Sequence, residues 1–164
     1  MLRLTLVRHA KSSWDHPGMR DFERPLNARG LRDAPVMAVR VAELRRLPDR
    51  LVSSPALRAI STARVFAARL GVPEDGIALE PRIYDASRRT LAEVVRELDP
   101  GSRHAMLFGH NPGFSELANW LATCPFDEMP TCAIASLELQ VGAWRELGAG
   151  CGRLAGYLYP KDGG

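Results

Sequence analysis

Short apolar runs of strand length alternate with segments of helical periodicity along this chain of 164 residues. This alternation restricts the fold more than any other feature, because strands separated by helices assemble into a largely parallel sheet that helices cover. The strand-like runs are residues 2–7, 50–53, 77–79, 105–108, 133–141 and 153–158, the last two forming a hairpin around 142–152. We therefore expect an α/β fold with three layers, α/β/α, around a mostly parallel central sheet of five to six strands.

Helix start and stop signals lie between these runs. Asn27 is a suitable cap for a helix of apolar period 3.6, although Pro35 predicts kinked first turns or a late start. Ser54 is expected to cap a second helix with Pro55 in its first turn, and Gly71 to end it. Two further helices are expected over residues 90–98 and 114–122.

Length and composition indicate an ordinary globular protein. With 46% hydrophobic and 25% charged residues, we expect one domain over residues 1–164, present as a monomer. No apolar run is long enough to cross a membrane, and no secretory signal opens the chain. Three cysteines without metal-ligand spacing fit a reduced protein, so we expect a cytoplasmic location and no membrane association.

The formal charge of +3 does not indicate nucleic-acid binding. Only two of the 22 basic residues are lysines, and the arginines are dispersed instead of clustered among aromatic side chains. We therefore expect no nucleic-acid partner. A mildly basic protein does attract phosphorylated or acidic partners.

Residues with catalytic potential follow three of the predicted strands. Arg8 and His9 follow the first strand, Arg58 comes shortly after the second, and His110 follows the run 105–108. In open α/β sheets, ligands bind beyond the carboxyl ends of the strands, so these side chains are expected to meet there. The guanidiniums can hold phosphate oxygens, and the imidazoles can supply a nucleophile and a hydrogen-bond donor.

The sign of the charges indicates the kind of substrate. Two like charges 4 Å apart repel by about 4 kcal/mol at an effective dielectric constant of 20. Arg8 and Arg58 are therefore favourable together only around an anion of more than one charge. Phosphate meets this requirement better than a carboxylate does.

Five segments carry a resemblance to a known family. They are residues 6–12 (LVRHAKS), 24–27 (RPLN) with Gly30, 54–63 (SPALRA, then TA), 109–113 (GHNPG) and 133–136 (AIAS). In this order they resemble the histidine phosphatase superfamily, which includes the cofactor-dependent phosphoglycerate mutases, and its short SixA-like phosphohistidine phosphatase branch. The resemblance implies a phosphoglycerate mutase-like fold.

It also implies a role for each candidate residue. His9 would be the nucleophile that becomes transiently phosphorylated, while Arg8 and Arg58 would hold the phosphoryl oxygens. His110 would donate a hydrogen bond to the phosphoryl group. Water would then hydrolyse the intermediate, and the reaction would need no metal and no other cofactor.

One segment departs from the family pattern. Larger members carry a glutamate general acid in a lid inserted after the third strand, whereas residues 80–87 are short and lack that motif. Asp85 is the nearest substitute, with Glu80 behind it, although an aspartate here equally fits an ordinary turn. General acid help is worth about 10²–10⁴ in rate, and a departing imidazole needs it less than an alkoxide does.

These observations predict a metal-independent hydrolase that removes phosphate from phosphohistidine on a protein, such as a phosphorelay partner. A small-molecule phosphomonoesterase of the same fold is the nearest alternative, and a non-catalytic phosphate-binding adaptor is an alternative of another class. A mutase is disfavoured because no lid insertion is evident. Three tryptophans are expected to be packing residues: Trp14, Trp120 and Trp144.

Overall fold

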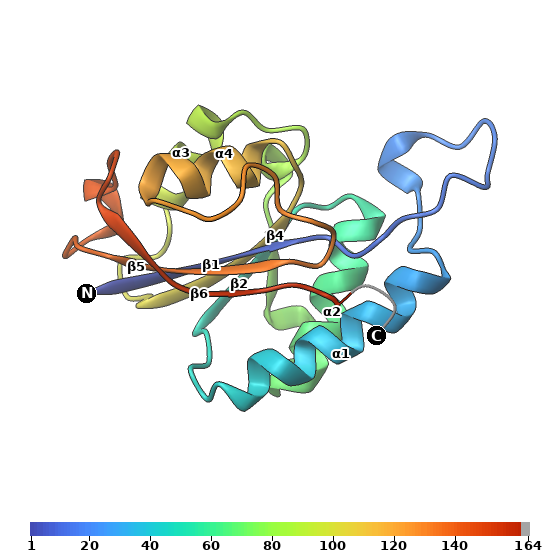
Figure 1. Ribbon diagram of the computed structural model, residues 1–164, viewed down its shortest axis with the longest axis horizontal. Helices are drawn as coiled ribbons and strands as arrows, with labels where there is room; N and C mark the ends of the chain where they lie inside the picture. The colour runs from blue at the N-terminus through green and yellow to red at the C-terminus, as the bar shows by residue number, and fades with distance from the viewer. Residues whose placement is uncertain (162–164) are drawn as a thin grey trace.

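One sheet of six strands in the order β3-β2-β4-β1-β5-β6 forms the centre of the computed structural model, which describes residues 1–161 (Figure 1). The strands are β1 (Leu2–Arg8), β2 (Arg50–Ser53), β3 (Ile77–Leu79), β4 (His104–Gly109), β5 (Ile134–Leu139) and β6 (Gly152–Leu158). The pairs β1–β4, β4–β2 and β2–β3 are parallel, while β5 runs antiparallel to β1 and to β6. The predicted sheet and its terminal hairpin are confirmed.

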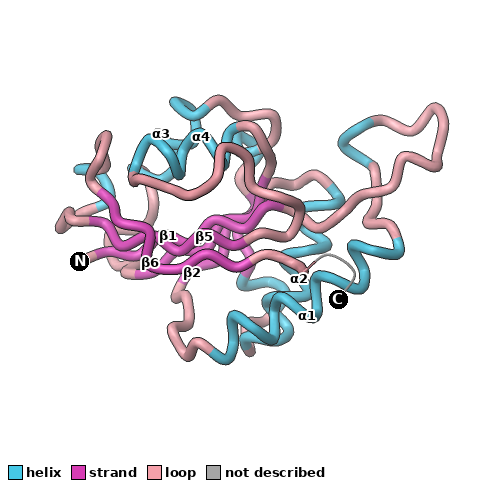
Figure 2. Tube along the Cα trace, viewed as in Figure 1, coloured by secondary structure: helices cyan, strands magenta, loops and turns pink. Residues whose placement is uncertain are grey.

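Helices cover both faces of this sheet (Figures 1 and 2). On one face lie α1 (Ala28–Glu43) and α2 (Leu57–Leu70), and on the other α3 (Arg88–Arg96) and α4 (Gly113–Leu121). Short 3₁₀ turns complete the elements: η1 (Asp21–Glu23), η2 (Glu74–Gly76), η3 (Pro81–Ile83) and η4 (Trp144–Glu146). The three layers are therefore confirmed. Residues 80–87 between β3 and α3 contain only η3, so no lid is inserted in this part of the described chain.

Each face of the sheet has its own hydrophobic core. Leu4 and Leu6 of β1 pack on the α3–α4 side with Phe114, whereas Val7 packs on the α1–α2 side with Phe66. A central strand buried on both faces requires a nearly continuous apolar run, which explains the sequence of β1.

Two helix starts differ from the prediction. Asn27 caps α1 as expected, its side chain accepting a hydrogen bond from the amide of Gly30, but the helix continues through Pro35 without a late start. Pro35 deprives only the carbonyl of Leu31 of its intrahelical donor, and Leu31 is exposed to solvent. Ser54 does not cap α2: the N-cap is Ala56, and the helix begins at Leu57.

The other end of α2 matches its sequence signal. Gly71 ends the helix in the left-handed conformation at φ 75°, which glycine adopts without steric cost. Within residues 1–161 no helix combines the length and the apolar character needed to cross a membrane.

Strand register brings the carboxyl ends of three strands together. Arg8 at the end of β1 pairs with Gly109 at the end of β4, and Ser53 at the end of β2 pairs with Phe108. Thr62 of α2 fastens this edge: its hydroxyl accepts a hydrogen bond from the amide of Ala10 at 3.0 Å and donates to the carbonyl of Arg58 at 2.8 Å. The segments that carry the candidate residues therefore meet at one edge of the sheet.

The start of α1 tolerates no side chain at Gly30, because a methyl group there would clash with the carbonyl oxygen of Lys11. We expect Gly30→Ala to lower the free energy of unfolding by about 1–3 kcal/mol, the usual cost of overpacking. Urea denaturation measures the change. Gly148→Ala is the matched control, since its nearest new contact would lie at 3.9 Å. Equal stability of the two variants would contradict the close packing at Gly30.

Candidate active site

The four residues predicted from the sequence line one pocket of about 210 Å³ at the carboxyl edge of the sheet: Arg8, His9, Arg58 and His110. Six further residues complete the lining: Lys11, Ser12, Trp14, Arg24, Asn111 and Thr131. The lining contains several cations and no carboxylate, so the pocket is suited to an anion.

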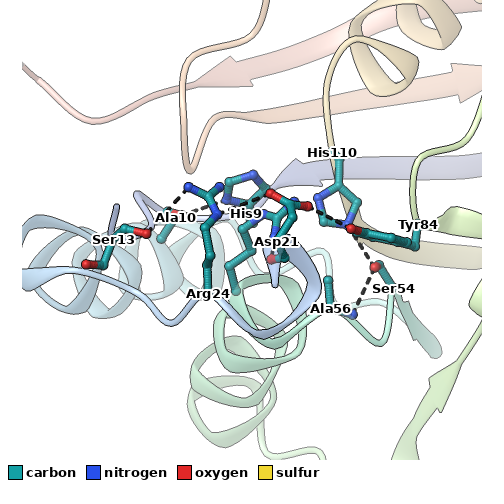
Figure 3. A network of polar contacts seen from close by, with 10 residues as sticks. His9, Ala10, Ser13, Asp21, Arg24, Ser54, Ala56, Tyr84 and His110 are labelled. Carbon is teal, nitrogen blue, oxygen red and sulfur yellow. Dashed lines mark hydrogen bonds and ion pairs between the residues drawn. The ribbon is translucent and has the colours of Figure 1, made fainter. Parts of the chain in front are cut away.

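His9 is fixed in place by both its backbone and its side chain. Its amide donates to the carbonyl of Gly109 at 3.0 Å, which extends the β1–β4 ladder by one residue. Its ring Nδ1 lies 2.7 Å from the carbonyl oxygen of Ala10 (Figure 3). Because a carbonyl only accepts, Nδ1 carries the proton and Nε2 keeps a free lone pair. This is the arrangement that a nucleophilic imidazole requires.

His110 can supply a hydrogen-bond donor to the pocket, whereas His9 supplies a lone pair. Its Nε2 lies 2.8 Å from Ser54 Oγ, which already accepts a hydrogen bond from the amide of Ala56 at 3.2 Å. Ser54 can donate its hydroxyl proton to Nε2, and the ring proton then lies on Nδ1, which has no acceptor among the described residues. The two imidazole centroids are 5.2 Å apart, so both rings border the same space in the pocket.

Both imidazoles are neutral at physiological pH. Burial lowers the pKa of His9 from 6.5 to about 3, and the positive charges of Arg58 and Arg8 act in the same direction. Burial, followed by the charge of Arg58, likewise lowers the pKa of His110 to about 3. Each ring therefore keeps the lone pair that protonation would remove.

Asp21 organises the cationic side of the pocket (Figure 3). Arg58 donates to the Asp21 carbonyl at 2.7 Å and to its carboxylate at 2.9 Å, and Tyr84 donates to the same carboxylate at 2.7 Å. Arg24 forms an ion pair with Asp21 at 3.2 Å. Partial burial opposes ionisation of Asp21, but the bonds from Tyr84 and Arg58 outweigh it and lower the pKa.

Arg8 is held from the opposite side. It donates to the carbonyl of Met129 at 2.8 Å, which also accepts from the side chain of Asn111. Burial lowers the pKa of the Arg8 guanidinium, and the nearby charge of Arg58 adds to this effect. The structure thus brings two arginines from distant segments close enough to interact electrostatically.

Besides Arg24 Nε, which is in an ion pair with Asp21, three buried nitrogens of the pocket have no hydrogen-bond partner among residues 1–161: Arg8 Nε, Arg58 Nε and His110 Nδ1. Buried donors without an acceptor cost free energy, so they favour a ligand that supplies several oxygens. They belong to three different segments that meet at this edge of the sheet. The arrangement fits a compact oxyanion.

The predicted substitute acid does not reach the pocket. Asp85 is exposed, has a left-handed backbone at φ 54°, and is not part of the lining. Glu80 is engaged with Arg82, which donates to it at 2.9 Å. Sequence reasoning missed Asp21, which begins the short turn η1 in a segment whose sequence has no helical or strand periodicity. Its spacing of three residues from Arg24 is the only local signal of the pair.

Ser54 has a role that sequence reasoning assigned differently. Its hydroxyl orients His110 instead of capping α2. No group of three or more His, Cys, Asp or Glu side chains is arranged to hold a metal ion in the described part of the chain. Independence from metals stays a prediction.

Comparison with known proteins gives one family. The sequence model of the histidine phosphatase superfamily (branch 1) matches residues 4–86. An uncharacterized chloroplastic protein of Arabidopsis thaliana is 32% identical over 172 residues, which cover 98% of this chain and 78% of that protein.

Solved structures of the same fold are also similar. A crystal structure from Agrobacterium tumefaciens, provisionally described as the phosphohistidine phosphatase SixA, has a TM-score of 0.80 at 29% identity and covers 98% of this chain and 99% of that one. The protein histidine phosphatase SixA complexed with tungstate has a TM-score of 0.80 at 22% identity, with 96% of each chain covered. The fold prediction and the SixA-like resemblance are thereby confirmed.

The buried neutral histidines predict how stability depends on pH. Below pH 6.5 His9 and His110 become protonated in the unfolded chain, whereas in the folded protein they stay neutral down to about pH 3. Protonation therefore favours the unfolded state, and the free energy of unfolding falls as the pH falls. Each histidine contributes up to about 1.4 kcal/mol per pH unit. Carboxylates with lowered pKa, such as Asp21, lose their contribution only below about pH 4.

Urea denaturation at pH 7, 6 and 5 in phosphate-free buffer tests this prediction. Phosphate and similar oxyanions must be omitted, because their binding to the pocket would stabilise the folded state. His9→Gln removes one of these histidines, so the free energy of unfolding of this variant should fall less steeply between pH 6 and 5, by up to about 1.4 kcal/mol per pH unit. A stability that does not change between pH 7 and 5 would mean that the buried histidines are charged in the folded protein.

Proposed function

Because this chain belongs to the histidine phosphatase superfamily, we propose that it removes phosphate from phosphohistidine on a partner protein, without a metal, through a phosphorylated His9. Membership of the superfamily implies phosphatase activity. One observation carries the finer proposal: a neutral imidazole with a free Nε2 lies among guanidiniums in a pocket without a lining carboxylate.

The first chemical step forms a bond between His9 Nε2 and the phosphorus of the substrate. The P–N bond to the departing imidazole breaks, and its electron pair stays on that nitrogen, which takes a proton from solvent. Nδ1 of His9 keeps its proton and its bond to Ala10, so the carbonyl stabilises the positive charge that the ring acquires. Arg8 and Arg58 hold the equatorial oxygens, and His110 Nδ1 donates to one of them.

The second step returns the enzyme to its first state. Water attacks the phosphorus of phospho-His9, the P–N bond breaks, and its electron pair returns to Nε2. Both protons of the water leave on the phosphate product or pass to solvent, and Nδ1 of His9 keeps its own. No protein carboxylate within the lining is needed for either step, because the leaving group of each is an imidazole nitrogen. This favours phosphohistidine over alkyl phosphates, whose alkoxide leaving groups require a strong proton donor.

The exposed edge of the sheet is consistent with a protein substrate. No lid is inserted over the pocket in residues 80–87. A phosphohistidine displayed on another protein can therefore approach along the carboxyl edge of the sheet. The similarity to the Agrobacterium protein at 29% identity supports the same substrate class.

Substitution of the pocket residues should separate nucleophile from phosphate ligand. We expect His9→Ala to abolish turnover, and Arg58→Ala to raise KM and reduce kcat, with kcat/KM falling about 10²–10³-fold. Arg64→Ala is the matched control, since Arg64 lies on the same helix but pairs with Glu74 outside the pocket. Steady-state kinetics measure all three variants, and normal turnover by His9→Ala would exclude it as the nucleophile.

The covalent intermediate offers a second measurement on the same proteins. Phosphohistidine is labile in acid, so an alkaline quench should trap phosphate on His9 and an acid quench should not. Mass spectrometry locates the label. Stable phosphate on another residue of the pocket would contradict the proposed route.

A substrate panel tests the class of leaving group. A phosphohistidine peptide should be hydrolysed with a kcat/KM at least about 10²-fold above that for sugar phosphates, which lack a comparable leaving group. Para-nitrophenyl phosphate should fall between them because its leaving group is stabilised. Preference for sugar phosphates would indicate a small-molecule phosphomonoesterase, and tight binding without phosphate release would indicate an adaptor.

A further inference from the structure

Trp14 occupies an unusual position for a tryptophan. The sequence predicts a packing residue, and Trp144 confirms this prediction with 2% exposure, whereas Trp14 is 73% exposed. The 10–26 loop that carries it projects from the rest of the fold (blue in Figure 1). Trp14 nevertheless lines the same pocket as His9 and Arg58. The prediction of packing is therefore wrong for Trp14.

The exposed ring is fixed by an arginine. The guanidinium carbon of Arg24 lies 3.4 Å from the centroid of the Trp14 ring, which is the distance of direct stacking. Arg24 is itself only 8% exposed and forms the ion pair with Asp21. One face of the indole is thus covered by a buried cation, and the ring is held at the edge of the pocket.

The indole is otherwise largely exposed to solvent, and it lines the same pocket as the phosphate-binding groups. An aromatic face prefers to stack on another flat ring, and Arg24 gives this ring a fixed orientation. A planar group bonded directly to a phosphorus held in this pocket is therefore within reach of the Trp14 ring. We infer that Trp14 is a stacking platform for a planar aromatic or heteroaromatic ring attached to the phosphoryl group.

This inference rests on the proposed function, and it adds a determinant of specificity. The imidazole of phosphohistidine is a ring of this kind, whereas sugar and alkyl phosphates carry puckered or flexible groups. Discrimination would then have two sources: the leaving-group chemistry at His9 and the stacking surface at Trp14. A stacked pair of this type corresponds to about a tenfold preference.

Two inert ligands can measure the stacking apart from catalysis. Phenylphosphonate carries a planar ring on phosphorus, and cyclohexylphosphonate carries a puckered ring of the same number of heavy atoms. In both ligands the ring is joined to phosphorus by a P–C bond, which a phosphatase of this kind does not hydrolyse. Calorimetry should show that the wild-type protein binds phenylphosphonate about tenfold more tightly than cyclohexylphosphonate.

Three variants assign the preference to one residue. Trp14→Leu should lose the preference by weakening only the phenyl ligand, and Trp14→Phe should retain most of it. Trp120→Leu is the matched control, because Trp120 also stacks with an arginine, Arg88 at 4.4 Å, but lies outside the pocket. Thermal unfolding curves verify that each variant is folded.

The outcomes separate this inference from the proposed function. Equal affinity of the two phosphonates in the wild-type protein, or a preference retained by Trp14→Leu, overturns the role of Trp14 alone. Equal weakening of both ligands in Trp14→Leu would make Trp14 structural and would overturn it as well. If neither phosphonate nor inorganic phosphate binds, the pocket is not a phosphate site, and the proposed function fails with the inference.

Discussion

Asp21 lies between two arginines that would otherwise repel each other, with Arg58 at 2.9 Å and Arg24 at 3.2 Å. Each of these guanidiniums is largely buried, and burial followed by the charge of Arg58 lowers the pKa of Arg24. The carboxylate offsets this repulsion and fixes both side chains in one orientation. Because Tyr84 also bonds Asp21, the anchor extends from the 10–26 loop to the segment after β3. The orientation of both arginines, and with it the cationic side of the pocket, depends on this shared anion.

The positive field has a second consequence for the imidazoles. Burial alone already disfavours an imidazolium, and the guanidiniums disfavour it further, so His9 and His110 stay neutral. A neutral nucleophile and a set of permanent cations are then present together at physiological pH. The dianion of a phosphoryl group relieves the repulsion among the cations without removing the lone pair of His9.

The sequence was informative wherever a residue was tied to a regular element. Arg8, His9 and His110 follow strands that are apolar and short, so the general rule for α/β sheets placed them at one edge. Asp21 and the exposure of Trp14 could not be predicted in this way, because the 10–26 loop has no periodicity that fixes side-chain direction. The role of Ser54 was missed for a related reason: a serine before a helix is a common cap, and its bond to His110 spans 56 positions.

The pocket is assembled from two parts that are anchored differently. His9 continues the β1–β4 ladder, whereas Trp14, Asp21 and Arg24 belong to a loop whose ends are joined by an isolated bridge between Ser12 and Leu26. Sheet hydrogen bonds fix the backbone of His9, whereas Asp21 of the loop orients Arg58. A substitution at Trp14 alters neither of these bonds, so it changes what the pocket accepts without moving His9 or Arg58. With the proposed role of Trp14, substrate preference and phosphoryl transfer are assigned to different residues of one pocket.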